Sequence, residues 1–384
     1  MYFDNNATTP VLKEVLEAMQ PYFCEHYGNA SSIHHHGQET RAAVDKARES
    51  VATLLGCRAP EVVFTSGGTE SDNAAIFGMV ARGGHVITSA IEHHAVLNAC
   101  EQLESEGCEV TTIPVDGNGQ VDPGDVRRSL RPNTKLISIM MANNETGVLQ
   151  PVEEIGRIAA EADVYFHTDA VQAAGKVPLD VNRINCDLLS ISGHKMHAPK
   201  GIGAMYLRKG VLPKPLLYGG GQERKRRPGT ENVPAIVGLG KAAELAVEGL
   251  TNGQTDRLAQ MRDCLEGTIR GVVPSCGVNG GEAPRVPNTT NIYFDYIEAE
   301  ALVIALDLKG LAVSTGAACS SGALEPSHVL TAMGLPPERA RASIRFSLGK
   351  QNTPSEVDFV VDLLPDTVAR LRELSPVYKS AISS

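Results

Sequence analysis

The sequence of 384 residues predicts an α/β protein, with a mainly parallel sheet in a large domain and a smaller α+β domain. Two observations lead to this fold class. Through the first two thirds of the chain, short β-rich runs alternate with helix-like stretches, which is typical of a parallel sheet with helices on both faces. Near the run "TNGQT" (251–255) this alternation ends. The length also suits about two domains with a large buried core.

The first domain is expected to hold the parallel sheet. Its predicted strands cover residues 61–66, 85–90, 108–115, 135–142, 163–170, 187–192 and 201–207. Helix-like stretches between them include 71–81, 95–106 and 151–162. We therefore place the large domain at residues 12–254.

The second domain is expected to span residues 255–384, joined by the N-terminal segment 1–11. A helical segment opens it, followed by strands at 289–294, 311–315 and 343–348 and a helix at 298–310. The last helix has clear start signals, because Thr353 can cap it, Pro354 suits its first turn and Glu356 completes a capping box.

Charge and composition exclude several classes of protein. The net charge of −10 and the pI near 5.6 argue against binding to nucleic acid or to an anionic membrane. No apolar run reaches the roughly 18 residues of a membrane span, and the first residues do not resemble a secretory signal. The eight cysteines form no Cys-x-x-Cys pair, which favours free thiols in a reducing cytoplasm. The run His34–His36 does not place three imidazoles on one face, so we expect no metal site.

Polar residues follow five of the predicted strands. Open α/β sheets bind ligands at the carboxyl ends of their strands, so these residues are candidates for one site. They are Gly68 and Thr69, then His93, then Asn144, then Asp169 and Gln172, and finally Ser192, His194 and Lys195. Taken singly, the glycines could form only a turn and a helix cap, His93 could be a structural histidine and Asp169 could be a cap or an ion pair. Their convergence on one edge is the stronger signal.

Lys195 stands between two apolar runs, where an ammonium group would lose its hydration. A lysine that forms a Schiff base with an aldehyde cofactor has no such group to bury. Pyridoxal 5′-phosphate (PLP) requires a lysine, an acid beside its ring nitrogen, a phosphate cradle and a group on its ring face. The strand ends offer these in Lys195, Asp169, Gly68 with Thr69, and His93, while Asn144 and Gln172 can bond the ring hydroxyl. Asp169 would keep the ring nitrogen protonated.

Several motifs together resemble the cysteine desulfurases of the NifS/IscS type. They include "YFDNNATTP", "FTSGGTESDN", "HTDAVQ", "SGHKMHAPKG", "RRPGTEN", "STGAACSSGALEPS" and "SIRFSLG", and the match runs nearly end to end. The resemblance implies a fold-type-I PLP enzyme related to the class-V aminotransferases. It also implies a homodimer that converts L-cysteine to L-alanine, holds the sulfur as a persulfide on a cysteine and passes it to acceptors such as iron–sulfur scaffolds.

The resemblance also implies roles for individual residues. The catalytic residues would be Cys319, Lys195 and His93. The phosphate contacts would be Gly68, Thr69, Ser192 and His194, with Thr230 reaching over from the second subunit. The ring contacts would be Asn144, Asp169 and Gln172, and the substrate would be bound by Arg345 and Asn144.

Local sequence supports some of these roles and leaves alternatives open. Cys319 lies among small residues and glycines, as in an exposed loop, whereas the other seven cysteines lie mostly in apolar or helical contexts. Arg345 could instead form a structural ion pair. Two other functions stay open: a selenocysteine lyase or other β-eliminating PLP enzyme, and a non-catalytic sulfur-relay scaffold. Retention of Lys195, Asp169, His93 and Cys319 argues against the scaffold.

Overall fold

The computed structural model describes residues 1–316, 326–376 and 378. The larger of its two sheets has the strand order β1-β7-β6-β5-β4-β2-β3. The pairs β2–β3, β2–β4, β4–β5 and β5–β6 are parallel, and β7 runs antiparallel to both β1 and β6. The strands are β1 (Val62–Thr65), β2 (His85–Ser89), β3 (Glu109–Ile113), β4 (Thr134–Ser138), β5 (Tyr165–Asp169), β6 (Leu188–Ser192) and β7 (Gly203–Leu207). The predicted α/β class is confirmed.

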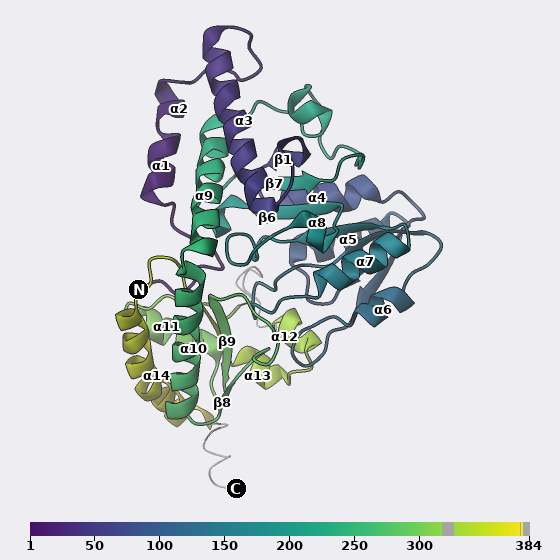
Figure 1. Cartoon of the computed structure of the whole chain (residues 1–384). Helices are drawn as coiled ribbons and strands as arrows, with labels where there is room; N and C mark the ends of the chain where they lie inside the picture. The colour runs from purple at the N-terminus through teal and green to yellow at the C-terminus, as the bar shows by residue number, and fades with distance from the viewer. Residues whose placement is uncertain (317–325, 377, 379–384) are drawn as a thin grey trace.

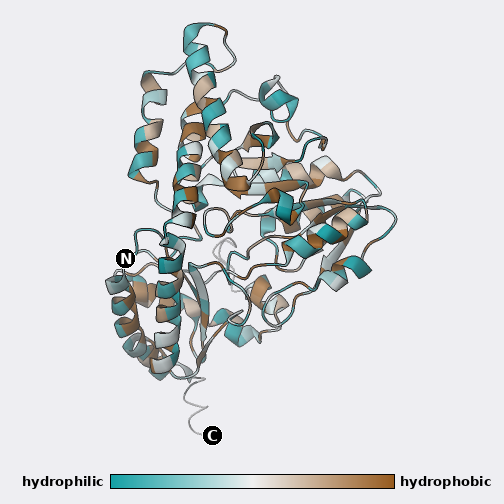
Figure 2. Cartoon of the chain, in the orientation of Figure 1, coloured by the Kyte–Doolittle hydropathy of each residue, from teal (hydrophilic) through white to brown (hydrophobic). Residues whose placement is uncertain are grey.

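Helices cover both faces of this sheet. Neighbouring strand residues point to opposite faces, so Leu136 packs with α4 (Gly68–Met79) and α5 (His94–Ser105), while Ile137 packs on the other side. That other side holds α3 (His35–Leu55), α7 (Val152–Glu161) and α9 (Val233–Thr251), with α3 and α9 side by side (Figure 1). The short helices of this part are α1 (Lys13–Met19), α2 (Pro21–Cys24), α6 (Pro123–Arg128) and α8 (Val181–Ile184). Figure 2 shows the hydrophobic residues gathered on the strands between these helical layers.

A second sheet of three antiparallel strands lies in the lower part of Figure 1. Its strands are β8 (Cys276–Val278), β9 (Thr289–Phe294) and β10 (Ser343–Ser347), in the order β10-β9-β8. The helices around it are α10 (Gln254–Val272), α11 (Ala299–Asp307), α12 (His328–Ala332), α13 (Pro337–Arg341) and α14 (Pro354–Leu374). α14 starts with the predicted capping box of Thr353 and Glu356.

One predicted strand is wrong. Residues 311–315 make only isolated bridges, in which Ala312 pairs with Tyr2 and Ser314 pairs with Arg345. The two residues face different partners, so no continuous ladder forms. The predicted boundary at residue 255 falls in the first turn of α10, and the division into two domains stays a prediction.

The N-terminal segment runs between the two sheets. Phe3 is buried in the core of the smaller sheet, and the backbone of Asp4 bridges to Ser347 on β10. Five residues later, the Thr9 N–H donates to the carbonyl oxygen of His194, just after β6 of the larger sheet. The segment therefore reaches the carboxyl ends of the large sheet from the small one. Among the described residues, no helix is long and apolar enough to cross a bilayer.

Candidate active site

Gly68 begins α4 directly after β1, and the structure leaves no room for a larger residue there. A Cβ atom at Gly68 would lie 2.9 Å from Val171 Cγ2 and 3.8 Å from the Cβ of Ser192. A Cβ at Gly67 would lie 3.7 Å from Ser192 Oγ. The ends of β1 and β6 therefore meet here, at the N-terminus of a helix of 12 residues whose N–H groups favour an anion. Thr69 is the next residue of this cradle.

Asp169 ends β5 in a nearly dry position. Its side chain is 5% exposed, its Oδ1 accepts a hydrogen bond of 2.8 Å from the Val171 N–H, and burial raises its pKa to about 6. A second buried carboxyl, Asp72 of α4, interacts electrostatically with Asp169, and its Oδ1 lies 3.5 Å from His167 Nε2. Burial and the charge of Asp169 raise the pKa of Asp72 well above its usual range. A cationic group bound at Asp169, such as a protonated pyridine nitrogen, would offset this cost.

Lys195 follows β6 in the short helix η2 (Gly193–Lys195) and is half-buried. Its Nζ donates hydrogen bonds to two backbone carbonyl oxygens, at 2.6 Å to Asn6 and 2.8 Å to Ala7. Its charge adds to burial in lowering the pKa of His93, and it partly offsets the rise that burial causes in the pKa of Asp169. The lysine therefore interacts electrostatically with both the predicted ring-face histidine and the predicted acid.

His93 caps the N-terminus of α5. Its Nδ1 accepts a hydrogen bond of 3.1 Å from the Ala95 N–H, which leaves a proton on Nε2 of the neutral ring. Burial, then Lys195 and two neighbouring histidines, lower the pKa of His93 to about 4. His93 is therefore neutral at neutral pH, as a ring stacked on an aromatic cofactor would be.

Arg345 on β10 is 3% exposed and links the two sheets. Its Nη1 donates to the Asn144 carbonyl oxygen at 3.0 Å, and its Nη2 donates to Asp4 Oδ1 at 2.6 Å. The ion pair considered as an alternative from the sequence is therefore present. The buried Nε of Arg345 has no hydrogen-bond partner within the described part of the chain, so the guanidinium retains donor capacity.

Gln172 belongs to a group of contacts that the sequence did not predict. Its Nε2 donates to the Asn6 carbonyl oxygen at 3.0 Å, and its Oε1 accepts from Lys176 Nζ at 2.6 Å. Burial, then the charges of Lys195 and Arg345, lower the pKa of Lys176 well below its usual range. Only two weak features of the sequence could have indicated these contacts. One is a lysine four residues after Gln172 in the run "AAGKV", and the other is the pair of adjacent asparagines in "DNNATTP".

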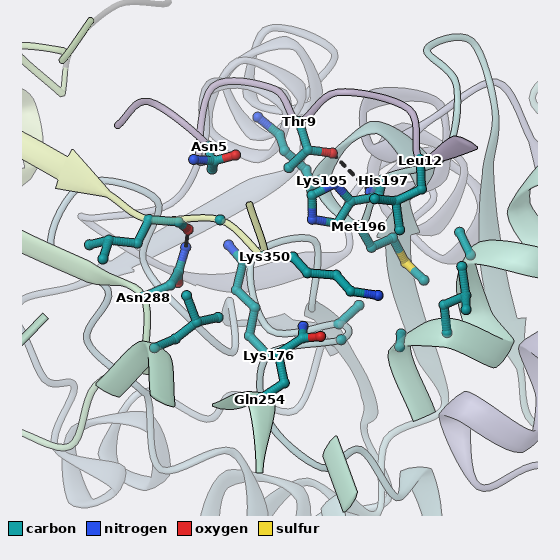
Figure 3. Close-up of a pocket in the computed structure, with 18 residues that line it drawn as sticks. Asn5, Thr9, Leu12, Lys176, Lys195, Met196, His197, Gln254, Asn288 and Lys350 are labelled. Atoms are coloured by element: carbon teal, nitrogen blue, oxygen red, sulfur yellow. Dashed lines mark hydrogen bonds between the residues drawn. The ribbon is translucent and has the colours of Figure 1, made fainter. Parts of the chain in front are cut away.

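A cavity of about 60 Å³ lies beside these residues. Figure 3 shows Lys176, Lys195 and Lys350 around it, together with Asn288 from the part of the chain that forms the smaller sheet. Of the described residues that line it, none is acidic. Ligand pockets usually measure about 300–1,000 Å³, so this cavity is too small to be the cofactor pocket itself.

The remaining predicted residues lie in different settings. His194 pairs through Nδ1 with Thr8 Oγ1 at 3.1 Å, and burial lowers its pKa to about 4. Thr230 is exposed, in the segment where Arg227 pairs with Glu70 of α4 at 2.9 Å. Cys319 lies outside the described residues.

The other cysteines only partly match the sequence-based expectation. Cys100, Cys108 and Cys186 are buried, as expected. Cys24 and Cys264 are exposed, so the expectation of core-like surroundings is wrong for them, because they lie on outward faces of α2 and α10. Exposure alone therefore does not single out one reactive thiol. In the described ranges, no three His, Cys, Asp or Glu side chains are grouped so that they could hold a metal ion.

Comparisons with known proteins show the family to which the chain is similar. Residues 1–360 match the family model "Aminotransferase class-V". The chain is 52% identical over 381 residues to "Cysteine desulfurase IscS" of Methanosarcina thermophila, covering 98% of this chain and 94% of the relative. It is 49% identical over 380 residues to "Cysteine desulfurase IscS" of Dictyoglomus turgidum, covering 98% and 96%.

Two solved structures share the fold and much of the sequence. A "NifS-like protein" superimposes with a TM-score of 0.90 at 39% identity, covering 97% of this chain and 100% of that one. "SspA in complex with cysteine" superimposes with a TM-score of 0.81 at 40% identity, covering 92% and 99%.

Proposed function

Because the chain belongs to the class-V aminotransferase family and is a cysteine desulfurase of the IscS type, we propose that the site around Lys195 converts L-cysteine to L-alanine. The supporting observation is the setting of Lys195, which follows β6 while buried Asp169 ends the neighbouring parallel strand β5, and whose charge acts on both Asp169 and neutral His93. The substrate sulfur is retained on Cys319 and then passed to an acceptor, such as an iron–sulfur scaffold. A homodimer working in the reducing cytoplasm is part of the same proposal.

The family uses PLP, and the residues present fit this cofactor. The cradle at Gly68 has no space for a Cβ, and the buried pair Asp169 and Asp72 favours a cation, as a protonated ring nitrogen would be. In this proposal Gly68, Thr69, Ser192 and His194 hold the phosphate group, with Thr230 of the second subunit. Asp169, Asn144 and Gln172 hold the ring. When bound, PLP supplies an electron sink for the substrate carbon that loses its proton.

Lys195 is the proposed base for the α-proton of cysteine. The carbonyl oxygens of Asn6 and Ala7 accept its N–H groups, and such contacts stabilise the ammonium that forms when the amine takes a proton. His93, as a neutral imidazole, would lie on the ring face and could move a proton through its Nε2.

Arg345 is the proposed partner of the substrate carboxylate. A guanidinium has five N–H donors, and Asp4 and the Asn144 carbonyl take two of them. A carboxylate can therefore bind without displacing Asp4. A bidentate grip of this kind explains an arginine rather than a lysine at this position.

The sulfur step needs no external oxidant. The Cys319 thiolate attacks the sulfur of the substrate, so a new S–S bond forms while the C–S bond of the substrate breaks. The carbon takes up a proton and leaves as alanine, and Cys319 keeps a persulfide. One cysteine and one thiol thus give one alanine and one persulfide.

Product analysis tests this proposal and separates it from β-elimination. The purified holoenzyme is incubated with L-cysteine and dithiothreitol, and alanine and pyruvate are both quantified. A desulfurase gives alanine and sulfide in equal amounts, whereas a β-eliminating enzyme gives pyruvate, ammonia and sulfide. Pyruvate as the main product, or rapid turnover of selenocysteine with almost none of cysteine, would overturn the proposal.

A further inference from the structure

Asn6 uses all of its hydrogen-bonding groups at the junction between the two sheets. It is 1% exposed, and its N–H donates to Ser347 Oγ at 2.9 Å. Its side-chain Nδ2 donates to the Asn144 carbonyl at 3.2 Å and to Thr289 Oγ1 at 2.9 Å. Its Oδ1 accepts from Lys176 Nζ at 3.0 Å and from Asn288 Nδ2 at 3.2 Å. The orientation of this residue is therefore fixed from both sides.

The carbonyl oxygen of Asn6 is shared by two groups of the proposed site. It accepts from Lys195 Nζ at 2.6 Å and from Gln172 Nε2 at 3.0 Å. The next carbonyl, that of Ala7, accepts a second hydrogen bond from Lys195 at 2.8 Å. The side chain of Asn6 thus holds the peptide unit whose carbonyl oxygen accepts from the lysine amine.

Lys176 determines the orientation of two amides. Even as a neutral amine it has two N–H groups, and these meet the oxygens of Asn6 and Gln172 at 3.0 and 2.6 Å. The carbonyl oxygens of Asn6 and Asn144 add a constraint from the other side, because they accept N–H groups from Gln172 Nε2 and from Asn6 Nδ2. The two sets of contacts together fix which way each amide is turned.

We propose that Asn6, held by Lys176, is a positioning residue that holds the amine of Lys195 in place for proton transfer from the substrate. This inference rests on the proposed function, in which Lys195 is the base. Asn6 would act through the peptide carbonyls of Asn6 and Ala7. These oxygens favour one position for the free amine of Lys195 and stabilise its ammonium form.

The neighbouring residue Asn5 provides a matched control. It is also an asparagine, also 1% exposed, and it also connects the N-terminal segment to the smaller sheet. Its side chain bonds to Ser347 O at 2.9 Å and to Gln351 Nε2 at 2.9 Å. Its Nδ2 also lies 3.4 Å from Tyr2 O and 3.5 Å from Asn352 Oδ1, and none of these four partners is a proposed site residue. A purely structural role of the segment predicts similar effects for both asparagines.

The test compares the holoenzymes of Asn6→Ala and Asn5→Ala. Both should unfold at a lower temperature than the wild type. Asn6→Ala should also lose about tenfold or more in kcat with a smaller change in KM, because the loss falls on proton transfer. The kinetic isotope effect on kcat with α-deuterated cysteine should rise in Asn6→Ala and stay at the wild-type value in Asn5→Ala. Equal kcat values and equal isotope effects in the two variants would overturn the inference.

Lys176→Met keeps the test decisive if Asn6→Ala does not fold. This variant removes the N–H groups that orient both amides while retaining an unbranched side chain. It should lower kcat in the same direction and raise the isotope effect, and a wild-type isotope effect would overturn the inference. Wild-type protein that makes no alanine from cysteine would instead refute the proposed function, so the two failures are distinguishable.

Discussion

The strand ends of the large sheet and the N-terminal segment contribute different kinds of groups to one site. Asp169 and Lys195 lie at strand ends and have side chains that can carry charge or form a covalent bond. Asp4 and Asn6 lie in the N-terminal segment, and they hold Arg345 and Lys195 through an ion pair and backbone carbonyls. Groups that react and groups that position them can therefore come from distant parts of the sequence and still be in direct contact.

The largest effect is expected at Lys195, the strand-end residue with the proposed reactive amine. Lys195→Ala removes the amine that we propose binds the cofactor and takes the proton, so alanine formation should fall by about 10³-fold or more. The variant should still fold, since Lys195 is half-buried and its amine donates to backbone carbonyl oxygens, which the shorter side chain leaves in place. Alanine release and the visible absorbance of the cofactor are the measurements. A borohydride-reducible bond between the cofactor and another lysine of the variant would contradict the assignment.

Asp169→Asn should have the next largest effect. The amide keeps the shape and the contact from the Val171 N–H but cannot hold a proton on the ring nitrogen, so kcat should fall about 10²-fold while cofactor is retained. Steady-state kinetics together with the cofactor content of the purified variant measure this. Turnover close to that of the wild type would show that another group serves the ring nitrogen.

Glu92 can be compared with Asp169, because it too is a buried carboxyl at a strand end, but we propose no chemical role for it. Its Oε1 accepts from Ser89 Oγ at 2.5 Å and from the Met140 N–H at 2.9 Å, and burial raises its pKa to about 8. The folded state thus holds this proton more tightly than the unfolded state. The protonated carboxyl therefore contributes to the free energy of unfolding in full below about pH 4.5, and this contribution is lost as the pH rises through 8.

Glu92→Gln should therefore be stabilised relative to the wild type at pH 8, by on the order of a few kcal/mol, and much less so at pH 5. Urea unfolding of both proteins at the two pH values measures the difference. If the difference in free energy of unfolding between the two proteins were the same at both pH values, Glu92 would be ionised in the folded protein at both.

Thr353→Ala should have the smallest effect and should leave the site untouched. The Glu356 N–H donates to Thr353 Oγ1 at 3.4 Å at the start of α14, and losing such a cap costs about 1 kcal/mol. The melting temperature should drop slightly while kcat stays unchanged, and Thr353→Ser should restore the melting temperature. A fall in kcat would show that the small sheet transmits strain to the site.

The fold and the chemical groups could be predicted from the sequence because their signals are local. A β-rich run followed by Asp169 or by Lys195 is contained in about ten residues. The contact between Lys195 and Asn6 joins positions 189 residues apart, and it uses a backbone carbonyl that every residue has. No residue type marks such a contact. The wrong strand at 311–315 has the same origin, since its partners Tyr2 and Arg345 are distant in sequence.

The location of the sulfur after one turnover tests the central claim most directly. The holoenzyme is mixed with one equivalent of L-cysteine per site without reductant, and its peptides are analysed by mass spectrometry. Cys24 and Cys264 are exposed thiols and serve as internal controls. We expect one alanine per site and one additional sulfur on the peptide that contains Cys319. Sulfur on Cys24 or Cys264 instead, or alanine formed at the wild-type rate by Cys319→Ser, would contradict the account.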